Sequence, residues 1–423
     1  MTEAALGIDI GTSGVRIAAV DKAGSLLAMA EAPIVAPVQN SGRILQDANI
    51  WWEALRQAFD TLDIEEHTIL ALAVDGTSGT ILPIDKQGTP LDLASMYNDL
   101  AERSDVGRVV AVAPKETAAL GGSSPLARAL PMQERGSPSR ILHQADWIAG
   151  RLGGRFDVTD ENNALKTGYD PLSRTWPSWI AKTGMKLELL PEVVAAGTAI
   201  GKIGREAAEA LGLPDDVMIV AGTTDGCAAF LASGASEPGD GVTSLGSTLT
   251  LKLLSDRPVF APHYGIYSHR IGDRWLAGGA SNTGGAVLSH YFTREQIARL
   301  TPLIDPALPT GLDYYPLAKP GERFPINDPA FAPRVSPRPD DDRLFFQAML
   351  EGIAAVEALG YRRLAELGAS PLRSIRSVGG GAANPAWTKI RVRALGVTAI
   401  DAVSEHAAVG TARLAWRGIG HAN

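Results

Sequence analysis

Two aspartates stand beside turns of small residues, where a carboxylate could serve phosphate chemistry. Asp9 lies just before the Gly/Thr/Ser turn at 11–14, and Asp225 follows a similar segment at 222–224. Glycines let several backbone N–H groups point at one anion, and a carboxylate near that anion implies an accompanying cation. Phosphoryl transfer uses acids in two roles, one near Mg²⁺ and one that accepts the proton of the attacking hydroxyl. Asp225 could equally be a helix N-cap, and the sequence alone leaves both interpretations open.

Loops rich in Gly, Ser and Thr follow predicted strands around Thr12, Ser78, Ser247 and Gly380. Each loop alone is more often an ordinary turn, but together they suit a polyphosphate and a nucleoside. Residues 241–254 repeat the layout of residues 6–21, in which a Gly-Ser-Thr turn joins two strands. This weak duplication predicts two related domains that face each other across a cleft, with both turns clamping one polyphosphate. The second copy lacks the acid, since Thr243 and Ser244 occupy the corresponding positions.

The sequence also argues against several common kinds of nucleotide-binding and metal-binding site. The chain has no G-x-x-x-x-G-K-[ST] sequence, and the triple glycine at 379–381 lacks the third glycine of G-x-G-x-x-G. P-loop and dinucleotide-binding interpretations are therefore disfavoured. The single cysteine, Cys227, excludes intramolecular disulfides and multi-cysteine metal sites, and it is better interpreted as a small buried helix residue than as a nucleophile. The seven histidines show no metal-binding spacing.

Charge and hydropathy exclude several classes of partner. The formal net charge of -8, without a Lys/Arg cluster, argues against nucleic acid as a main partner, because phosphate backbones require a basic face. Hydrophobic residues make up 45% of the 423 residues, which fits two ordinary domains, and no apolar run has the length of a membrane span. The first residues lack the basic region of a signal peptide. We therefore expect a cytoplasmic protein without membrane association.

The elements that would position these loops form a mixed sheet. Apolar runs predict strands at residues 5–10, 15–20, 25–31, 69–74, 217–221 and 374–378. Helices are predicted over 48–62, with Asp47 as its cap, and over 343–367. Asn384 is a predicted N-cap for a helix that begins at Pro385. The early order of three strands, a helix and a strand differs from the strand–helix alternation of a dinucleotide fold.

Four segments carry a family resemblance, in this order along the chain: GIDIGTSGVR at 7–16, GTTDGCAA at 222–229, SLGST at 244–248 and GGGAAN at 379–384. They resemble the first phosphate hairpin, the segment with the catalytic aspartate, the second phosphate hairpin and the adenosine loop of the FGGY family of carbohydrate kinases. That family is part of the superfamily of actin, hexokinase and the 70-kilodalton heat-shock ATPases. The similarity extends over nearly the whole chain.

The resemblance implies an α/β fold of two ribonuclease-H-like domains, each with a mixed five-stranded sheet flanked by helices, and ATP in the cleft between them. Residues 1–236 would hold the substrate and the first phosphate hairpin, and residues 237–423 the nucleotide. Asp225 would be the general base, and Mg²⁺ would be held by Asp225 and, through water, by Asp9. The ATP-binding residues would be Asp9, Gly11, Thr12, Ser13, Arg16, Gly246, Ser247, Thr248, Gly284, Gly380, Gly381 and Asn384. The sugar would be bound by Asp75, Gly76, Ser78, Asn98 and Asp99.

Two segments differ from the family pattern, and both belong to the region expected to bind the sugar. Xylulose kinases carry Gln-Met-His-Gly where this chain has Gly-Thr-Ser-Gly at 76–79, and the spacing from Asp99 to Arg103 exceeds that of the usual Trp-Asn-Asp-x-Arg segment. The short length, Tyr-Asn-Asp at 97–99 and Gly-Thr-Thr-Asp-Gly-Cys at 222–227 together are most similar to a compact branch from cyanobacteria and plants, described as xylulose kinase-like and associated with D-ribulose. We therefore expect a D-ribulose kinase, monomeric or homodimeric. The alternatives are a D-xylulose or polyol kinase and a sugar-independent ATPase of the actin and heat-shock type.

Overall fold

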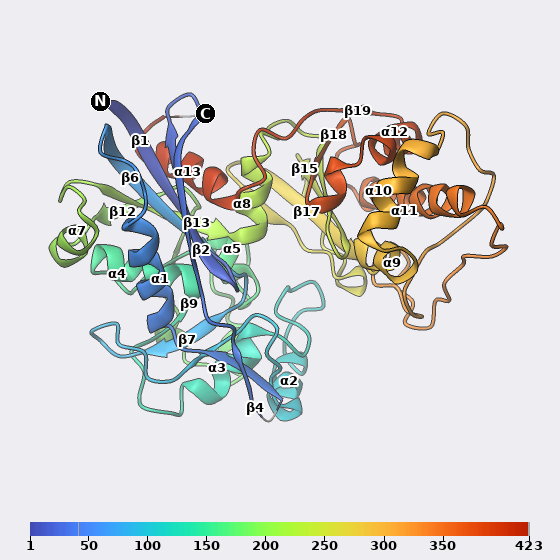
Figure 1. Ribbon diagram of the computed structural model, residues 1–423. Helices are drawn as coiled ribbons and strands as arrows, with labels where there is room; N and C mark the ends of the chain where they lie inside the picture. Colours follow the sequence, from blue (N-terminus) through green and yellow to red (C-terminus); the bar gives the residue numbers. More distant parts are fainter. Residues whose placement is uncertain (41, 422–423) are drawn as a thin grey trace. The chain divides into compact units, whose positions relative to one another are not determined.

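The computed structural model describes residues 1–40 and 42–421 of the chain (Figure 1). The chain divides into two compact units. The first comprises Met1–Ala232, His269–Gly272 and His406–Asn423, and the second comprises Ser233–Ser268 and Asp273–Glu405. The division after Ala232 lies close to the predicted boundary at 236/237. The C-terminal residues from His406 onward, which the prediction assigned to the second domain, lie in the first unit.

The main sheet of the first unit is built on an apolar hairpin. β1 (Thr2–Ile10) and β2 (Gly14–Asp21) are antiparallel, and β3 (Leu26–Pro33) extends that edge. On the other side of β1 lie the parallel strands β6 (His67–Gly76) and β13 (Met218–Thr224), followed by the antiparallel β12 (Ala199–Lys202). Both faces of the sheet are covered, which explains why its central strands are continuous apolar runs in the sequence.

Helices cover both faces of this sheet, and each face has its own hydrophobic core. On one face, α1 (Asn49–Phe59), α4 (Gln144–Gly153) and α7 (Arg205–Leu211) pack against the sheet. On the other face lie α8 (Asp225–Ala232) and α13 (Ala407–Gly418). α1 is shorter than the predicted helix, and its N-cap is Ala48 rather than Asp47. The carboxylate of Asp47 instead accepts a hydrogen bond from the N–H of Asn49 at 2.9 Å.

The position of α13 explains the assignment of the C-terminal residues to the first unit. A Cβ atom on Gly7 of β1 would lie 1.8 Å from the carbonyl oxygen of Ala408, so the helix backbone rests directly on the strand. Trp416 is fully buried, and its Nε1 donates to the carbonyl oxygen of Val20 at 2.9 Å, across 396 positions of sequence. Burial of an aromatic side chain of this size stabilises the docked helix by roughly 2–3 kcal/mol.

A second sheet and short elements complete the first unit. The strands of this sheet, in spatial order, are β4 (Val38–Asn40), β5 (Arg43–Gln46), β8 (Ala94–Ser95), β7 (Ile81–Ile84) and β9 (Arg140–His143). Part of it shares a core with α2 (Arg103–Val110), α3 (Pro125–Met132) and α6 (Trp179–Lys182). The remaining elements are β10 (Val158–Asp160), α5 (Glu161–Leu165), η1 (Leu187–Leu189), β11 (Glu192–Val194) and β16 (His269–Ile271).

The second unit repeats the strand pattern of the first. β14 (Asp240–Leu245) and β15 (Leu249–Ser255) form an antiparallel hairpin, and β17 (Arg274–Ser281) extends its edge. β18 (Ser374–Val378) and β19 (Thr398–Ala399) continue in parallel from β14. The order β17-β15-β14-β18-β19 therefore corresponds to β3-β2-β1-β6-β13. This shared order confirms the duplication inferred from the two hairpins. Each of the two mixed sheets has six strands rather than the predicted five, because the sheets also include the edge strands β12 and β16.

One long helix runs through the core of the second unit. α11 (Asp342–Glu366) matches the predicted helix over 343–367, and Phe345, Met349 and Ile353 are among its fully buried residues. It is long and apolar enough to cross a membrane, contrary to our expectation from the sequence, but most of its apolar stretch is buried in the protein. The other helical elements of this unit are η2 (Pro262–Tyr264), α9 (Gly285–Tyr291), α10 (Arg294–Leu300), η3 (Thr301–Leu303), η4 (Gly380–Ala383) and α12 (Pro385–Leu395).

Candidate functional site

Three carboxylates gather where the parallel strands of the first unit end. Asp9 on β1 is in register with Asp75 on β6, and Asp75 is in register with Thr223 on β13. Asp225 is the first residue of α8, directly after β13 ends at Thr224. Ligands of α/β proteins bind at such strand ends, where residues far apart in the sequence become neighbours. The predicted position of Asp225, between a strand end and a helix start, is confirmed.

The pKa values of Asp9 and Asp75 are both raised in this group of acids. Burial raises the pKa of Asp75 well above its ordinary value, and the charges of Asp9 and Asp225 raise it further. Burial also raises the pKa of Asp9, with a contribution from Asp225 that Arg16 opposes. The hydroxyl of Thr411 on α13 donates to Oδ2 of Asp75, whereas Oδ1 has no hydrogen-bond partner among the described residues. A cation bound here would relieve the repulsion among these carboxylates.

The turn between β1 and β2 places small polar residues beside Asp9. The N–H of Gly11 donates to the carbonyl oxygen of Gly14 at 3.0 Å and closes the turn. Ser13 is exposed and Thr12 is half-buried. Nη1 of Arg16 donates to Oδ2 of Asp9 at 3.3 Å. The structure thus brings together Gly11, Thr12, Ser13 and Arg16 with Asp9, and their binding to ATP stays a prediction.

The loop after β6 presents polar atoms that the protein does not satisfy. β6 ends at Gly76, and Oε1 of Gln144 accepts hydrogen bonds from the N–H and the hydroxyl of Thr77 at 3.0 and 2.7 Å. The hydroxyl of Ser78 is buried, and the described residues offer it no hydrogen-bond partner. An unpaired buried polar group costs about 1–3 kcal/mol, so a hydroxyl-rich ligand would compensate Ser78 and Oδ1 of Asp75.

Asp99 and Asn98 differ in their availability to a ligand. Asp99 is fully buried and accepts hydrogen bonds from Arg43, from the hydroxyl of Ser95 and from the N–H of Ile44, at 2.5–3.0 Å. Although burial raises the pKa of Asp99, these donors lower it below the ordinary value. In this structure the carboxylate positions Arg43 and its own loop, so a sugar contact at Asp99 would require some of these bonds to be replaced. Asn98 is exposed, which is compatible with the predicted contact.

Arg128 on α3 joins the two predicted sugar-binding loops, and our sequence reasoning missed it. Nη1 of Arg128 donates to the carbonyl oxygens of Ser95 and Met96, both at 2.9 Å, and to the hydroxyl of Ser95 at 2.8 Å. Nη2 donates to the carbonyl oxygens of Gly79 and, at 3.2 Å, Ser123. The residue is buried, and its burial lowers its pKa to about 10. A charged residue within the apolar stretch 125–132 was the one available signal.

In the second unit, the hairpin turn between β14 and β15 contacts the start of α9. The N–H groups of Gly285 and Ala286 donate to the carbonyl oxygens of Gly246 and Ser247 at 2.8 and 3.0 Å. Gly284 has a φ of 138° and no room for a side chain, since a Cβ atom would lie 2.8 Å from the backbone of Thr248. The predicted nucleotide residues Gly246, Ser247, Thr248 and Gly284 are therefore direct neighbours, with Ser247 and Thr248 exposed.

The glycine loop after β18 packs on the same hairpin. A Cβ atom on Gly381 would lie 2.8 Å from the Cβ of Leu245, so the loop backbone lies close to the strand end. Oδ1 of Asn384 accepts the N–H of Trp387 at 3.0 Å, which confirms Asn384 as the N-cap of α12. Gly380 and Gly379 border a cavity of about 420 Å³ whose lining includes Glu405. The second unit thus brings Gly284 and the glycine loop next to the hairpin turn at 246–248.

No group of three or more His, Cys, Asp and Glu side chains in residues 1–40 and 42–421 has an arrangement that could hold a metal ion by itself. Mg²⁺ usually keeps several waters and binds one or two carboxylates together with substrate phosphates. The acids Asp9 and Asp225, beside the unsatisfied Oδ1 of Asp75, fit that mode of binding rather than a closed protein site. Cys227 is buried in α8, as expected from the sequence.

Family comparison covers most of the chain. Residues 4–106 and 133–232 match the N-terminal domain of the FGGY family of carbohydrate kinases, and residues 241–419 match the C-terminal domain of that family. The xylulose kinase of Staphylococcus epidermidis is 22% identical over 415 residues, which cover 92% of this chain and 82% of that protein. The autoinducer-2 kinase of Yersinia enterocolitica is 25% identical over 472 aligned positions, which cover 98% of this chain and 86% of that one.

Solved structures share the fold. A "xyloylose kinase" from Brucella ovis has a TM-score of 0.87 at 23% identity and covers 99% of this chain and 91% of its own. A gluconate kinase from Lactobacillus acidophilus has a TM-score of 0.84 at 18% identity, with 99% and 90% covered. At these identities the likeness shows the two-domain actin-like ATPase fold that the sequence predicted.

Proposed function

Since the chain belongs to the FGGY family of carbohydrate kinases, we propose that it transfers the γ-phosphoryl group of ATP to a hydroxyl of a ketopentose, D-ribulose. The position of Asp225 supports this proposal most directly. Asp225 is the first residue of a helix that begins at the end of a parallel strand. Its carboxylate lies close enough to Asp9 and Asp75 to raise the pKa values of both. A rigidly held carboxylate beside two further acids suits a general base that works next to a bound cation.

In the proposed reaction, Asp225 accepts the proton of the attacking sugar hydroxyl while the new O–P bond forms and ADP leaves. Mg²⁺ would be held by Asp225 and, through water, by Asp9, and it would supply shielding of the phosphate charge. The turns at 11–13 and 246–248 would hold the phosphates through backbone N–H groups and hydroxyls. Gly284 would support the phosphates, and Gly380, Gly381 and Asn384 would line the nucleoside site.

The choice of D-ribulose depends on the loops that would face the sugar. Oγ of Ser78 and Oδ1 of Asp75 are buried and have no hydrogen-bond partner among the described residues, and Asn98 on another loop is exposed. Hydroxyls of an open-chain ketose could satisfy such atoms. The segment Gly-Thr-Ser-Gly at 76–79 differs from the Gln-Met-His-Gly of xylulose kinases, which favours D-ribulose over D-xylulose. We further infer a cytoplasmic monomer or homodimer that binds neither nucleic acid nor membranes.

ADP release by the purified chain tests the proposal. The acceptors are D-ribulose, D-xylulose, ribitol, glycerol and gluconate, with a reaction that lacks an acceptor as the baseline. We expect D-ribulose to give the highest kcat/KM. Asp225→Asn should lower the phosphorylation of D-ribulose by about 10²-fold or more, because the general base is lost, while ADP binding measured by calorimetry persists. Turnover by Asp225→Asn at the wild-type rate would overturn the role of Asp225.

The same assay separates the alternatives. A preference for D-xylulose or a polyol would retain the kinase and change its substrate. ADP release at the same rate with and without any acceptor would instead support a sugar-independent ATPase of the actin and heat-shock type. Detection of the phosphorylated sugar by mass spectrometry distinguishes acceptor transfer from sugar-stimulated hydrolysis.

A further inference from the structure

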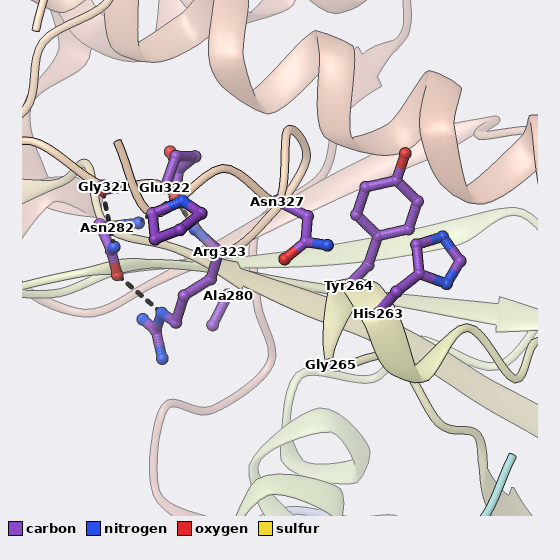
Figure 2. A pocket seen from close by; sticks show the side chains of 10 residues that line it. His263, Tyr264, Gly265, Ala280, Asn282, Gly321, Glu322, Arg323 and Asn327 are labelled. Carbon is purple, nitrogen blue, oxygen red and sulfur yellow. Dashed lines mark hydrogen bonds between the residues drawn. The ribbon is translucent and has the colours of Figure 1, made fainter. Parts of the chain in front are cut away.

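A cavity of about 540 Å³ with both apolar and polar lining lies within the second unit, and its lining includes none of the residues predicted to bind ATP or the sugar (Figure 2). It is lined by residues 263–265, Ala280, Asn282 and part of the segment 321–329. That segment folds back on itself, because the N–H groups of Glu322 and Asp328 donate to each other's carbonyl oxygens at 2.8 and 2.9 Å. The cavity is large enough for a small metabolite.

Arg323 supplies this cavity with a positive charge that no carboxylate neutralises. Its Nε donates to Oδ1 of Asn282 at 2.6 Å, and Nδ2 of Asn282 donates to the carbonyl oxygen of Gly321 at 2.9 Å. No carboxylate in the described part of the chain forms an ion pair with Arg323. Nη2 makes a long hydrogen bond of 3.5 Å to the carbonyl oxygen of Ser281, and Nη1 makes no hydrogen bond within the described residues. Asn282 therefore orients the guanidinium through one edge and leaves donors at its far end, which suits a phosphate group.

Glu322 also lines the cavity, but its carboxylate is committed to the protein. Its oxygens accept hydrogen bonds from the hydroxyls of Ser281 and Tyr315 at 2.6 and 2.8 Å. They also accept the N–H groups of Asn282 and Arg323 at 2.8 and 2.9 Å. Because Glu322 is only 3% exposed, its role is to hold the segment at 321–323 against the end of β17, and the exposed Arg323 remains the charge available to a ligand.

The aromatic rings on the opposite side of the cavity already have contacts within the protein. Figure 2 shows Arg323 and Asn282 on one side, His263 and Tyr264 on the other, and Asn327 between them. The ring of Tyr264 already contacts the guanidinium of Arg363, whose Cζ lies 5.5 Å from the ring centroid. It also contacts the ring of His263, and the two ring centroids are 4.3 Å apart. Contacts of this kind leave little ring surface for a nucleobase. The amide of Asn327, by contrast, makes no hydrogen bond within residues 1–40 and 42–421 and could bind hydroxyls.

Asn327 also adopts a backbone conformation that few non-glycine residues take, with a φ of 59°. A non-glycine residue in this region is strained by roughly 1–2 kcal/mol, although Asn tolerates it better than most. Glycine would adopt this conformation without strain, so the presence of Asn here is consistent with a role of its side-chain amide in the cavity.

We propose that this cavity binds the phosphate monoester of a small sugar or polyol, with Arg323 at the phosphate and Asn327 and His263 at the hydroxyls. The product of the proposed reaction and sugar phosphates from other reactions share this chemistry. The site does not depend on which sugar the enzyme phosphorylates.

Calorimetric titration of the full chain tests the site, with D-ribulose 5-phosphate, glycerol 3-phosphate, inorganic phosphate, D-ribulose and ADP as separate probes. Each sugar phosphate is also titrated with D-ribulose and ADP at saturation, to separate this cavity from the proposed catalytic site. We expect at least one sugar phosphate to bind under saturation, and Arg323→Gln to weaken it by about tenfold or more. Arg362→Gln, an exposed arginine on α11, is the matched control and should leave binding unchanged.

Asn327→Gly provides a second variant that should fold at least as well as the wild type, because glycine relieves the positive φ. We expect it to weaken the sugar phosphate several-fold without affecting inorganic phosphate. Equal binding by wild type and Arg323→Gln would overturn the site, as would the absence of any binding under saturation. Tighter binding of ADP through Arg323 would assign the cavity to the nucleotide instead. If sugars fail as acceptors but sugar phosphates still bind through Arg323, the proposed function fails and the site stands.

Discussion

Asp9 and Asp75 occupy paired positions on the adjacent parallel strands β1 and β6, and the pKa of each carboxyl is raised above its ordinary value. Burial is the main cause for both, and each is also raised by the charge of Asp225. The fold thus maintains a group of mutually repelling acids at a strand end, at a cost in stability. Such sites in enzymes are commonly organised for chemistry rather than for stability.

Replacement of Asp75 by Asn should raise the thermal stability of the protein and lower its kinase activity. A carboxyl with a raised pKa keeps its proton in the folded state at pH values where the unfolded chain has lost it. Its stabilising contribution is therefore present below the ordinary pKa of 3.8 and is lost as pH rises through the folded-state value. We expect Asp75→Asn to unfold at a higher temperature than wild type at neutral pH, with a smaller difference in acid.

Kinase activity should change in the opposite direction, with sugar phosphorylation by Asp75→Asn reduced by about 10²-fold. Thermal unfolding at several pH values and ADP release measure the two effects. Asp63→Asn, at an exposed position, is the control and should match wild type in both. A stability difference between Asp75→Asn and wild type that is constant across pH would contradict the assignment of a raised pKa.

Asp160 should give the stability of the protein a second dependence on pH. Burial and the charge of Asp146 raise its pKa to about 7, although it accepts the N–H groups of Asn162 and Asn163 at 2.8 and 3.0 Å. Between the ordinary value of 3.8 and about 7, the folded chain binds a proton that the unfolded chain has released. The free energy of unfolding should therefore fall with rising pH in this window, by at most roughly 1.4 kcal/mol per pH unit from this group.

Asp160→Asn removes that contribution while its side-chain oxygen can still accept the N–H groups at the start of α5. Chemical denaturation at pH 4.5, 5.5, 6.5 and 7.5 should show a flatter dependence for this variant than for wild type. Asp157→Asn, at a solvent-exposed ion pair with Arg155, should keep the wild-type slope. Parallel curves for Asp160→Asn and wild type would show that Asp160 titrates normally.

Local sequence signals predicted the parts of this fold that depend on neighbouring residues. The hairpins around Thr12 and Ser247, the helix start at Asn384 and the position of Asp225 follow from apolar runs, turn residues and caps within a few positions. Residues 6–21 and 241–254 show the duplication because each hairpin is a continuous segment of chain.

Contacts between distant segments could not be predicted in this way. Docking of α13 on β1 depends on Gly7 and Ala408, which lie at opposite ends of the sequence. Asp99 was predicted to face a sugar because polar residues on loops commonly bind hydroxyls, but Arg43 engages it through a pairing of β5 with β8 that has no local signal. Arg128 was missed for the same reason, since its partners come from three separate loops.

Asn384 should influence both the stability of α12 and the proposed nucleoside site. Its Oδ1 caps the N–H of Trp387, and its Nδ2 donates to the hydroxyl of Thr301 at 3.1 Å. Asn384→Ala should lower the free energy of unfolding by about 1 kcal/mol through loss of the cap. Asn384→Asp keeps the capping oxygen and is the matched variant. If the residue lines the nucleoside site, both variants should weaken ADP in calorimetry, whereas a purely structural role predicts a loss of stability for Asn384→Ala and normal ADP affinity for Asn384→Asp.

Arg128 provides the sharpest test of how the sugar loops are held. Its guanidinium donates to carbonyl oxygens on both sides of the proposed sugar site, at Gly79 and at Ser95 and Met96. Lysine retains the charge but cannot reproduce the forked set of donors, so the two loops would lose their fixed spacing. We expect Arg128→Lys to raise the KM for the sugar by about tenfold, with a smaller change in the KM for ATP.

A merely structural role for Arg128 would lower the amount of folded protein and leave both KM values unchanged. Titration of active sites and thermal unfolding therefore accompany the kinetics. Arg135→Lys, a mostly exposed arginine 3.7 Å from Asp92, is the control and should behave as wild type. A KM for ATP that rises as much as the KM for the sugar would contradict a role confined to the sugar loops, because every hydrogen bond described for Arg128 goes to Gly79, Ser95, Met96 or Ser123 and none goes to a predicted ATP-binding residue.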